Sequence, residues 1–74
     1  MTFEKVRSVL AEHLELEIDE ITETTTFEEL GADSLDVVEV MMELEDVFGI
    51  EIATSEIGAS VEDLVAYIDN KINE

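Results

Sequence analysis

The sequence of 74 residues contains no cysteine, no proline and no tryptophan, and it has only three glycines. Without cysteine, the chain can form neither a disulfide nor a thiolate metal site. Proline and glycine are the residues that most often interrupt helices, so their scarcity beside many Glu, Leu and Val residues favours helices. We therefore expect an all-α fold, and the length fits a single small domain that spans residues 1–74.

Basic residues are also scarce. Three Lys and Arg residues stand against 21 Asp and Glu residues, which gives a net charge of −18. The sequence predicts no binding to nucleic acid, because contacts with phosphates need Lys and Arg. The charge should attract basic partners and keep copies of the chain apart, which indicates a monomer. Hydrophobic residues make up 46% of the chain, which is too many for a disordered acidic tail.

The chain has no long apolar segment. Its first residues, MTFEKVRSVLAEHLE, carry charges throughout and lack the apolar stretch of a secretory signal. Nothing in the sequence approaches the length that a membrane-spanning helix needs. We expect a cytoplasmic protein with no stable membrane insertion.

Two segments at the ends of the chain have apolar residues at helical spacing. The first runs from Thr2 to about Glu15, with Thr2 as the expected N-cap. The last opens at Ser60, where Asp63 completes a capping box. The apolar stripes consist of Phe3, Val6, Val9, Leu10 and Leu14 in the first helix and Val61, Leu64, Val65, Ile68 and Ile72 in the last.

The central helix is predicted from Ser34 to Val47 or Phe48. Asp33 or Ser34 can cap its start, and Gly49 is a natural C-terminal stop. The residues of this helix divide into three faces, because a helix turns by about 100° per residue. One face is an acidic stripe of Asp36, Glu39, Glu43 and Asp46; the expected core face is Val37, Val40, Met41, Leu44, Val47 and Phe48; a second apolar ridge is Leu35, Val38 and Met42, separated from the core face by Glu45.

The second ridge has two interpretations. Either the loop or the region around Ile57 covers it, or it is exposed for a partner. A surface helix usually has one apolar stripe, so a second one requires a covering segment or a binding role. A methionine in the ridge suits an adaptable contact surface.

A long loop is expected between the first two helices. Its sequence, LELEIDEITETTTFEEL, includes three consecutive threonines, and such β-branched residues disfavour a continuous helix. We expect Ile18, Ile21 and Phe27 to hold this loop to the core. Thr26 and Glu29 fit a capping box, which predicts a single helical turn before Gly31.

Ser34, in the segment LGADSLD, has three interpretations. It can be only an N-cap. It can be a catalytic nucleophile, but that role needs a base held by a third group, and nothing marks His13, the single histidine, as that base. The glycine pattern of the hydrolase nucleophile elbow is also missing. It can instead be a substrate: an exposed hydroxyl that another enzyme modifies, with an added phosphate placed at the positive end of the helix.

The segment LGADSLDVVEVMMELEDVFGIEI, Leu30 to Ile52, resembles the central segment of acyl carrier proteins of the discrete kind found in bacterial fatty-acid synthesis. The first thirty residues are similar to the first helix and loop of that family, and the last helix is similar more loosely. Asp-Ser-Leu alone is a weak signal. Its frame of Gly31, the acidic helix and Phe48-Gly49-Ile50 makes the resemblance specific.

The resemblance implies a carrier rather than an enzyme. Ser34 would hold a phosphopantetheine arm, attached from coenzyme A by a phosphopantetheine transferase, and the arm's thiol would carry acyl groups as thioesters. The carrier would deliver them to acyl-transfer, condensing and reducing enzymes of fatty acid biosynthesis, which offer basic patches. The implied docking residues are Asp33, Leu35, Asp36, Val38, Glu39, Met42, Glu45 and Asp46.

The resemblance also implies a small four-helix bundle: three longer helices and a short third helix near Ser55 to Gly58. The segment from Glu51 to Ser60 is shorter than the usual form, and Ala53 stands where a proline is expected. The third helix is therefore expected to be short or stunted. The chain length of the acyl group stays open.

Alternative functions remain at this point. The chain can be a specialised carrier for a polyketide or another secondary acyl pathway, or an unmodified acidic adaptor that binds basic proteins. A calcium-binding role lacks the spaced Asp/Asn-Gly loop with its terminal Glu, so we expect loose association of cations and no dedicated metal site.

Overall fold

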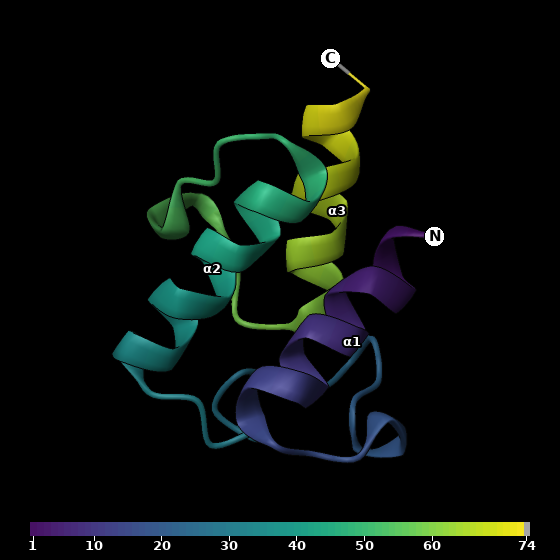
Figure 1. Ribbon diagram of the computed structural model, residues 1–74, viewed down its shortest axis with the longest axis vertical. Helices are drawn as coiled ribbons and strands as arrows, with labels where there is room; N and C mark the ends of the chain where they lie inside the picture. The colour runs from purple at the N-terminus through teal and green to yellow at the C-terminus, as the bar shows by residue number, and fades with distance from the viewer. Residues whose placement is uncertain (74) are drawn as a thin grey trace.

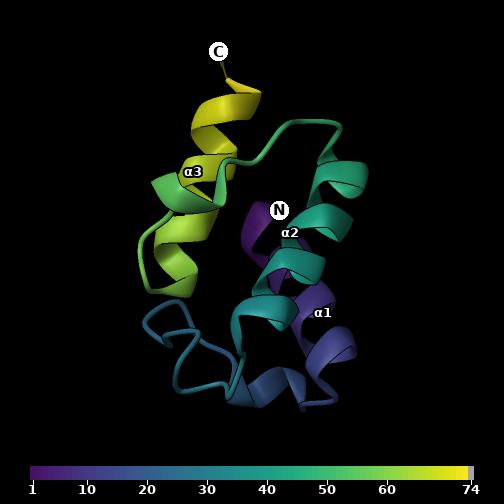
Figure 2. The ribbon, with the colours of Figure 1, turned by 90° about the vertical axis from the view of Figure 1, so that its left-hand side faces the viewer.

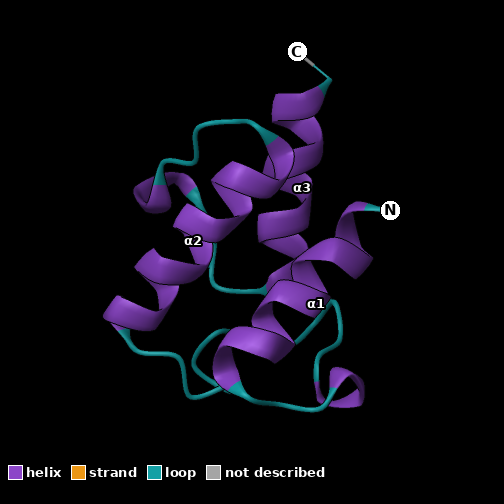
Figure 3. Ribbon diagram, viewed as in Figure 1, coloured by secondary structure: helices purple, strands orange, loops and turns teal. Residues whose placement is uncertain are grey.

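The computed structural model describes residues 1–73, and over this range the protein consists of helices and loops (Figures 1 and 3). Within the described residues there is no strand, only an isolated bridge between Thr26 and Ser60. The all-α prediction is confirmed. The elements in chain order are α1 (Thr2–Leu14), a 3-10 turn (Ile18–Glu20), α2 (Ser34–Phe48), a second 3-10 turn (Thr54–Glu56) and α3 (Val61–Ile72).

The expected count of four helices is not matched, because the short or stunted helix expected near Ser55 to Gly58 is only a single 3-10 turn. Between α2 and α3 the chain forms only the 3-10 turn Thr54–Glu56, with extended backbone at Ala53 and Ile57 on either side. The Ala53 N–H donates to the Tyr67 hydroxyl at 3.1 Å, which fastens the segment to α3. Within residues 1–73 the protein is therefore a bundle of three α-helices, with one 3-10 turn between α2 and α3.

The core lies where α1 meets α2 and α3 (Figure 2). Its side chains come from the apolar stripe of each helix, so the spacing in the sequence predicted most of them correctly. Each helix contributes about three buried positions because only one face of a surface helix turns inward. The buried residues are Val6, Val9, Leu10, Ala11, Ile21, Val40, Met41, Leu44, Ile52, Val61, Leu64 and Ile68.

Three residues predicted to be buried are instead exposed. Val47 is 46% exposed, Ile72 is 48% exposed, and Ile18 is 47% exposed. Val47 and Ile72 lie in the last turns of α2 and α3, and Val47 borders an open surface hollow beside the first turns of α1, so the core encloses neither. Ile18 lies in the 3-10 turn, whose backbone is held by the Arg7 Nε–H donating to the Ile18 carbonyl at 3.0 Å. The loop is thus anchored there through a polar contact.

The long loop from residue 15 to residue 33 closes one end of the bundle, the end far from the C-terminus in both views (Figures 1 and 2). Ile21 is fully buried and Phe27 packs against the core, as expected. The loop is also hydrogen-bonded to the start of α3. Phe27 N–H donates to the Ala59 carbonyl at 3.0 Å, and Val61 N–H donates to the Thr25 carbonyl at 2.8 Å. The loop therefore has a fixed path.

The predicted helix ends are confirmed except at the N-terminus. The N-cap of α1 is Met1, so the expectation of Thr2 in that role is wrong. The Thr2 hydroxyl donates instead to Asp69 on α3. Gly49 ends α2 in the left-handed region, with φ 66°, where a residue without Cβ is favoured. Ser60 and Asp63 form the expected capping box of α3. None of the helices in residues 1–73 has the length and apolar character for crossing a membrane.

Candidate modification site and docking face

Ser34 is the first residue of α2, and its side chain is exposed. The N-cap is Asp33, whose Oδ1 accepts the Asp36 N–H at 2.9 Å, while Asp36 Oδ2 accepts the Asp33 N–H at 3.3 Å. This reciprocal pair is a capping box. Because Asp33 fills the capping position, the interpretation of Ser34 as only an N-cap is wrong. Its hydroxyl stands in solvent at the end of the molecule where the long loop enters α2.

The turn before Asp33 sets the position of Ser34. Thr26 Oγ1 accepts the Glu29 N–H at 3.1 Å, and Glu29 Oε1 accepts the Thr26 N–H at 3.1 Å. The predicted capping box is therefore present, although it closes a turn rather than a helix. Gly31 follows with φ 76°, a conformation that residues with a Cβ rarely adopt. This turn leads the chain into α2 with the cap already aligned.

His13 does not form a catalytic relay with Ser34. Its Nε2 atom is 3.0 Å from Glu39 Oε2, so its partner is a carboxylate on α2. A serine nucleophile needs the histidine on its own hydroxyl, with a third group behind that histidine. The arrangement suits an oxygen that is activated by a base from another protein.

The second apolar ridge of α2 is exposed. Leu35 is 71% exposed, Met42 is 58% exposed and Val38 is 44% exposed. The interpretation that the loop or the Ile57 region covers the ridge is wrong. We call these three residues the outer ridge.

Acidic side chains border the outer ridge. Asp33, Glu39 and Asp46 are exposed, and Asp36 is half-buried beside the cap. Glu45 differs from the others, because it is half-buried and its Oε2 accepts the Ile52 N–H at 2.8 Å. That bond ties the segment after α2 to the helix, so Glu45 has a structural task whether or not it meets a partner.

The site fits a phosphodiester on Ser34. The oxygen is accessible, and the first backbone N–H groups of a helix point outward without intrahelical acceptors. The positive end of the helix dipole also favours a phosphate there. Asp33 Oδ1 already accepts one of these N–H groups, from Asp36. The N–H groups of Ser34 and Leu35 precede it in the first turn.

Comparison with known proteins decides the family. Residues 4–68 match the family model described as "Phosphopantetheine attachment site". The chain is also 51% identical over 69 residues to "Acyl carrier protein" of Streptococcus pyogenes serotype M1, which covers 93% of each chain. The chain belongs to the acyl carrier protein family. The acyl carrier proteins of Streptococcus thermophilus and Lactococcus lactis subsp. lactis are 49% and 43% identical to it, over 93% and 92% of this chain and 93% of each relative.

Membership of the acyl carrier protein family confirms the resemblance and the presence of a phosphopantetheine attachment site. What the sequence analysis missed is the grouping of His13 with Asp36 and Glu39, whose ligand atoms lie within 4.8 Å of one another. His13 and Glu39 are on different helices. The sequence contains no signal that pairs them, because their contact depends on how α1 crosses α2.

Proposed function

We propose that Ser34 is the attachment point of the phosphopantetheine arm and that the protein acts as a carrier without catalysing a reaction itself. The observation that carries the proposal is the exposed hydroxyl of Ser34 at the start of α2, inside the segment that matches the phosphopantetheine attachment model. Ser34 Oγ would form a phosphodiester with the pantetheine-bearing phosphate of coenzyme A, whose nucleotide portion leaves. The proton of the hydroxyl would pass to a base of the transferase.

The chain's own task is then to present the arm. An exposed oxygen at a helix end lets the arm extend into a partner's active site, while the bundle stays outside. Tethering raises the effective concentration of the acyl group at a docked enzyme. The thiol that ends the arm supplies the thioester chemistry that a chain without cysteine lacks.

The outer ridge and the acids around it form the proposed docking surface. Partners would be the phosphopantetheine transferase and acyl-transfer, condensing and reducing enzymes that offer basic patches. Opposite charges speed encounter and set orientation, and their effect falls with salt. The exposed apolar ridge then adds contact area at the centre. Such docking is fast and weak, as a shuttle between enzymes requires. The proposed residues are Asp33, Leu35, Asp36, Val38, Glu39, Met42, Glu45 and Asp46.

The proposed pathway is fatty acid biosynthesis, in the cytoplasm. It is supported by the similarity along nearly the whole length to bacterial proteins named "Acyl carrier protein". A specialised carrier for another acyl pathway is the second candidate, favoured by the short segment between α2 and α3, where a single 3-10 turn takes the place of a helix. Mass spectrometry of the protein from its own cells, with thioesters preserved, distinguishes them by the acyl group found.

The attachment is tested by incubating the full chain with coenzyme A and a broad-specificity phosphopantetheine transferase. We expect intact mass to rise by one arm in the unmodified protein and in Ser55→Ala, a control at another exposed serine. Ser34→Ala should keep its original mass. An arm on the Ser34→Ala variant, or no arm on the parent while a known carrier is modified in parallel, contradicts the proposal.

A further inference from the structure

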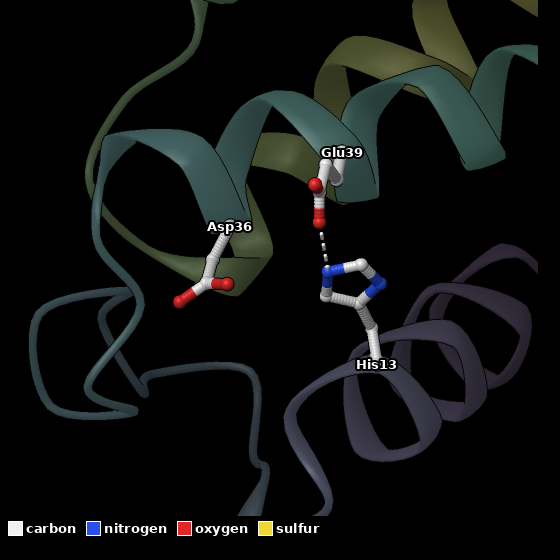
Figure 4. A group of neighbouring side chains, drawn as sticks. All are labelled: His13, Asp36 and Glu39. Atoms are coloured by element: carbon white, nitrogen blue, oxygen red, sulfur yellow. Dashed lines mark ion pairs between the residues drawn. The ribbon is translucent and has the colours of Figure 1, made fainter.

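Three potential metal ligands from two helices meet beside the start of α2. His13 lies in the last turn of α1, and Asp36 and Glu39 lie one turn apart on α2. Their ligand atoms all lie within 4.8 Å of one another. Figure 4 shows both carboxylates on the side of α2 that faces the imidazole ring. Nothing in the proposed function requires this histidine.

We propose that His13, Asp36 and Glu39 bind a zinc ion that joins α1 to α2. One imidazole nitrogen with two carboxylate oxygens is a donor set that zinc accepts. The imidazole nitrogen favours zinc over calcium and magnesium. Calcium and magnesium prefer oxygen ligands, whereas imidazole suits zinc and its neighbours in the transition series. Three protein ligands leave the fourth tetrahedral position to water.

The distances need only small side-chain movements. Zinc lies about 2.0–2.2 Å from its nitrogen and oxygen ligands, which sets the ligands of a tetrahedral site roughly 3.3–3.6 Å apart. His13 Nε2 and Glu39 Oε2 are already 3.0 Å apart, and the Glu39 side chain is 60% exposed and can adjust. Zinc would take the place of a hydrogen between these two atoms and bind the Nε2 lone pair, and the neutral imidazole would carry its proton on Nδ1.

Asp36 is oriented for this role by the helix cap. Its Oδ2 accepts the Asp33 N–H at 3.3 Å, and a carboxylate has further lone pairs available for a cation. Hydrogen bonds of this kind, behind a ligand, fix its direction and strengthen metal binding. The half-buried His13 is held by the packing of α1 against α2. The site is therefore more than an acidic cluster that attracts cations through its charge.

Zinc binding would have two consequences. It would stabilise the bundle, because an ion that binds only the folded chain raises the free energy of unfolding. It would also occupy Asp36 and Glu39, which belong to the proposed docking surface, and so slow docking. The second consequence rests on the proposed function. The binding test uses no partner protein, so its result is independent of whether the chain is a carrier.

The test is calorimetric titration of zinc chloride into the untagged full chain in physiological salt. A measurement of the intact mass first establishes that this protein carries no phosphopantetheine arm. We expect one zinc per chain and a shift of the His13 ring signals in the NMR spectrum at one equivalent. His13→Gln should lower the affinity by at least about tenfold, the scale seen when support of a metal ligand is lost. Glu62→Gln, which removes an equal charge at an exposed site on α3, should leave it unchanged.

Equal zinc affinity in the parent and in His13→Gln would overturn the proposal, because the ion would then be held by diffuse charge. If circular dichroism shows that His13→Gln is unfolded, the number of zinc ions bound per parent chain and the shift of its His13 ring signals decide whether the site exists. Ring signals of His13 that stay in place at one equivalent of zinc contradict the site. A repeat with the arm attached and its thiol alkylated checks that the same residues act in the modified carrier.

Discussion

The two apolar faces of α2 meet opposite surroundings. Val40, Met41 and Leu44 are at most 3% exposed and form part of the core, whereas Leu35 and Met42 on the outer ridge are 71% and 58% exposed. The side chains are of similar kind, so hydrophobicity does not decide which face turns inward. The packing of α1 decides it. One helix can thus hold the bundle together with one face and keep another face free for recognition.

The sharpest test of this difference is Leu44→Ala. Leu44 is fully buried, and removing such a side chain from a core costs about 2–5 kcal/mol of unfolding free energy. A domain of this size has only a few kcal/mol of net stability. We expect circular dichroism to show that the variant is already largely unfolded at the start of a urea titration. Met42→Ala should change the stability by less than about 0.5 kcal/mol, as exposed sites do. Equal losses would show that the ridge is packed in solution.

The reverse experiment measures function. We expect Met42→Ala to lower the kcat/KM of the transferase about tenfold, or ~1.4 kcal/mol of interaction with the partner. Val47→Ala is the control, because Val47 is exposed on the same helix but lies outside the outer ridge. An equal decrease in kcat/KM for the two variants would indicate that any exposed apolar side chain on α2 contributes to docking. The outer ridge would then not be a specific docking surface.

Two substitutions of Asp33 distinguish its role as the N-cap of α2 from the role of its negative charge. Asp33→Ala should lose about 1 kcal/mol of stability, because the Asp36 N–H loses its acceptor. Asp33→Asn should retain most of that stability, since asparagine is an equally good N-cap. If the negative charge contributes to docking, both variants are modified more slowly at low salt. Slow modification of Asp33→Ala alone would assign the whole effect to the helix start.

The smallest expected effect concerns the repulsion among acidic side chains, including those on the exposed face of α2. Added salt should raise the melting temperature, because it screens the repulsion within a chain of net charge −18. Glu43→Gln, at an exposed acid of α2, should melt higher than the parent at low salt, and the gap should close as salt increases. Thermal melts over a series of sodium chloride concentrations measure both. Melting temperatures that do not depend on salt would show that repulsion is not limiting.

The local structure of the helices was largely predictable. The apolar spacing in α1 and α3, a cap of α2 at Asp33 or Ser34, the stop at Gly49 and the capping box at Ser60 were predicted from side chains that act on neighbours within a turn or two, and the cap proved to be Asp33. Apart from the N-cap of α1, which is Met1 and not Thr2, the errors concern burial, which residues distant in the sequence decide. Val47 and Ile72 continue the apolar stripes of α2 and α3 into the last turn of each helix and are still 46% and 48% exposed, so the helical spacing predicted their face but not their burial.

The two connections between helices show the same limit. The family resemblance implied a short or stunted helix near Ser55 to Gly58, and the segment forms only the 3-10 turn Thr54–Glu56. The long loop was expected to be held to the core by Ile18, Ile21 and Phe27. It is also fixed by backbone hydrogen bonds between residues 25–27 and residues 59–61, which the sequence does not encode in any local pattern.

The sequence by itself determined that the chain is helical and acidic and pointed to Ser34 as the candidate attachment residue, because helix propensity, charge and the Asp-Ser-Leu frame are properties of neighbouring residues. Only the tertiary structure decided that the outer ridge stays uncovered and that His13 meets Asp36 and Glu39. Both depend on the angle and depth at which α1 packs on α2. That geometry results from the whole core at once, and no short stretch of the chain specifies it.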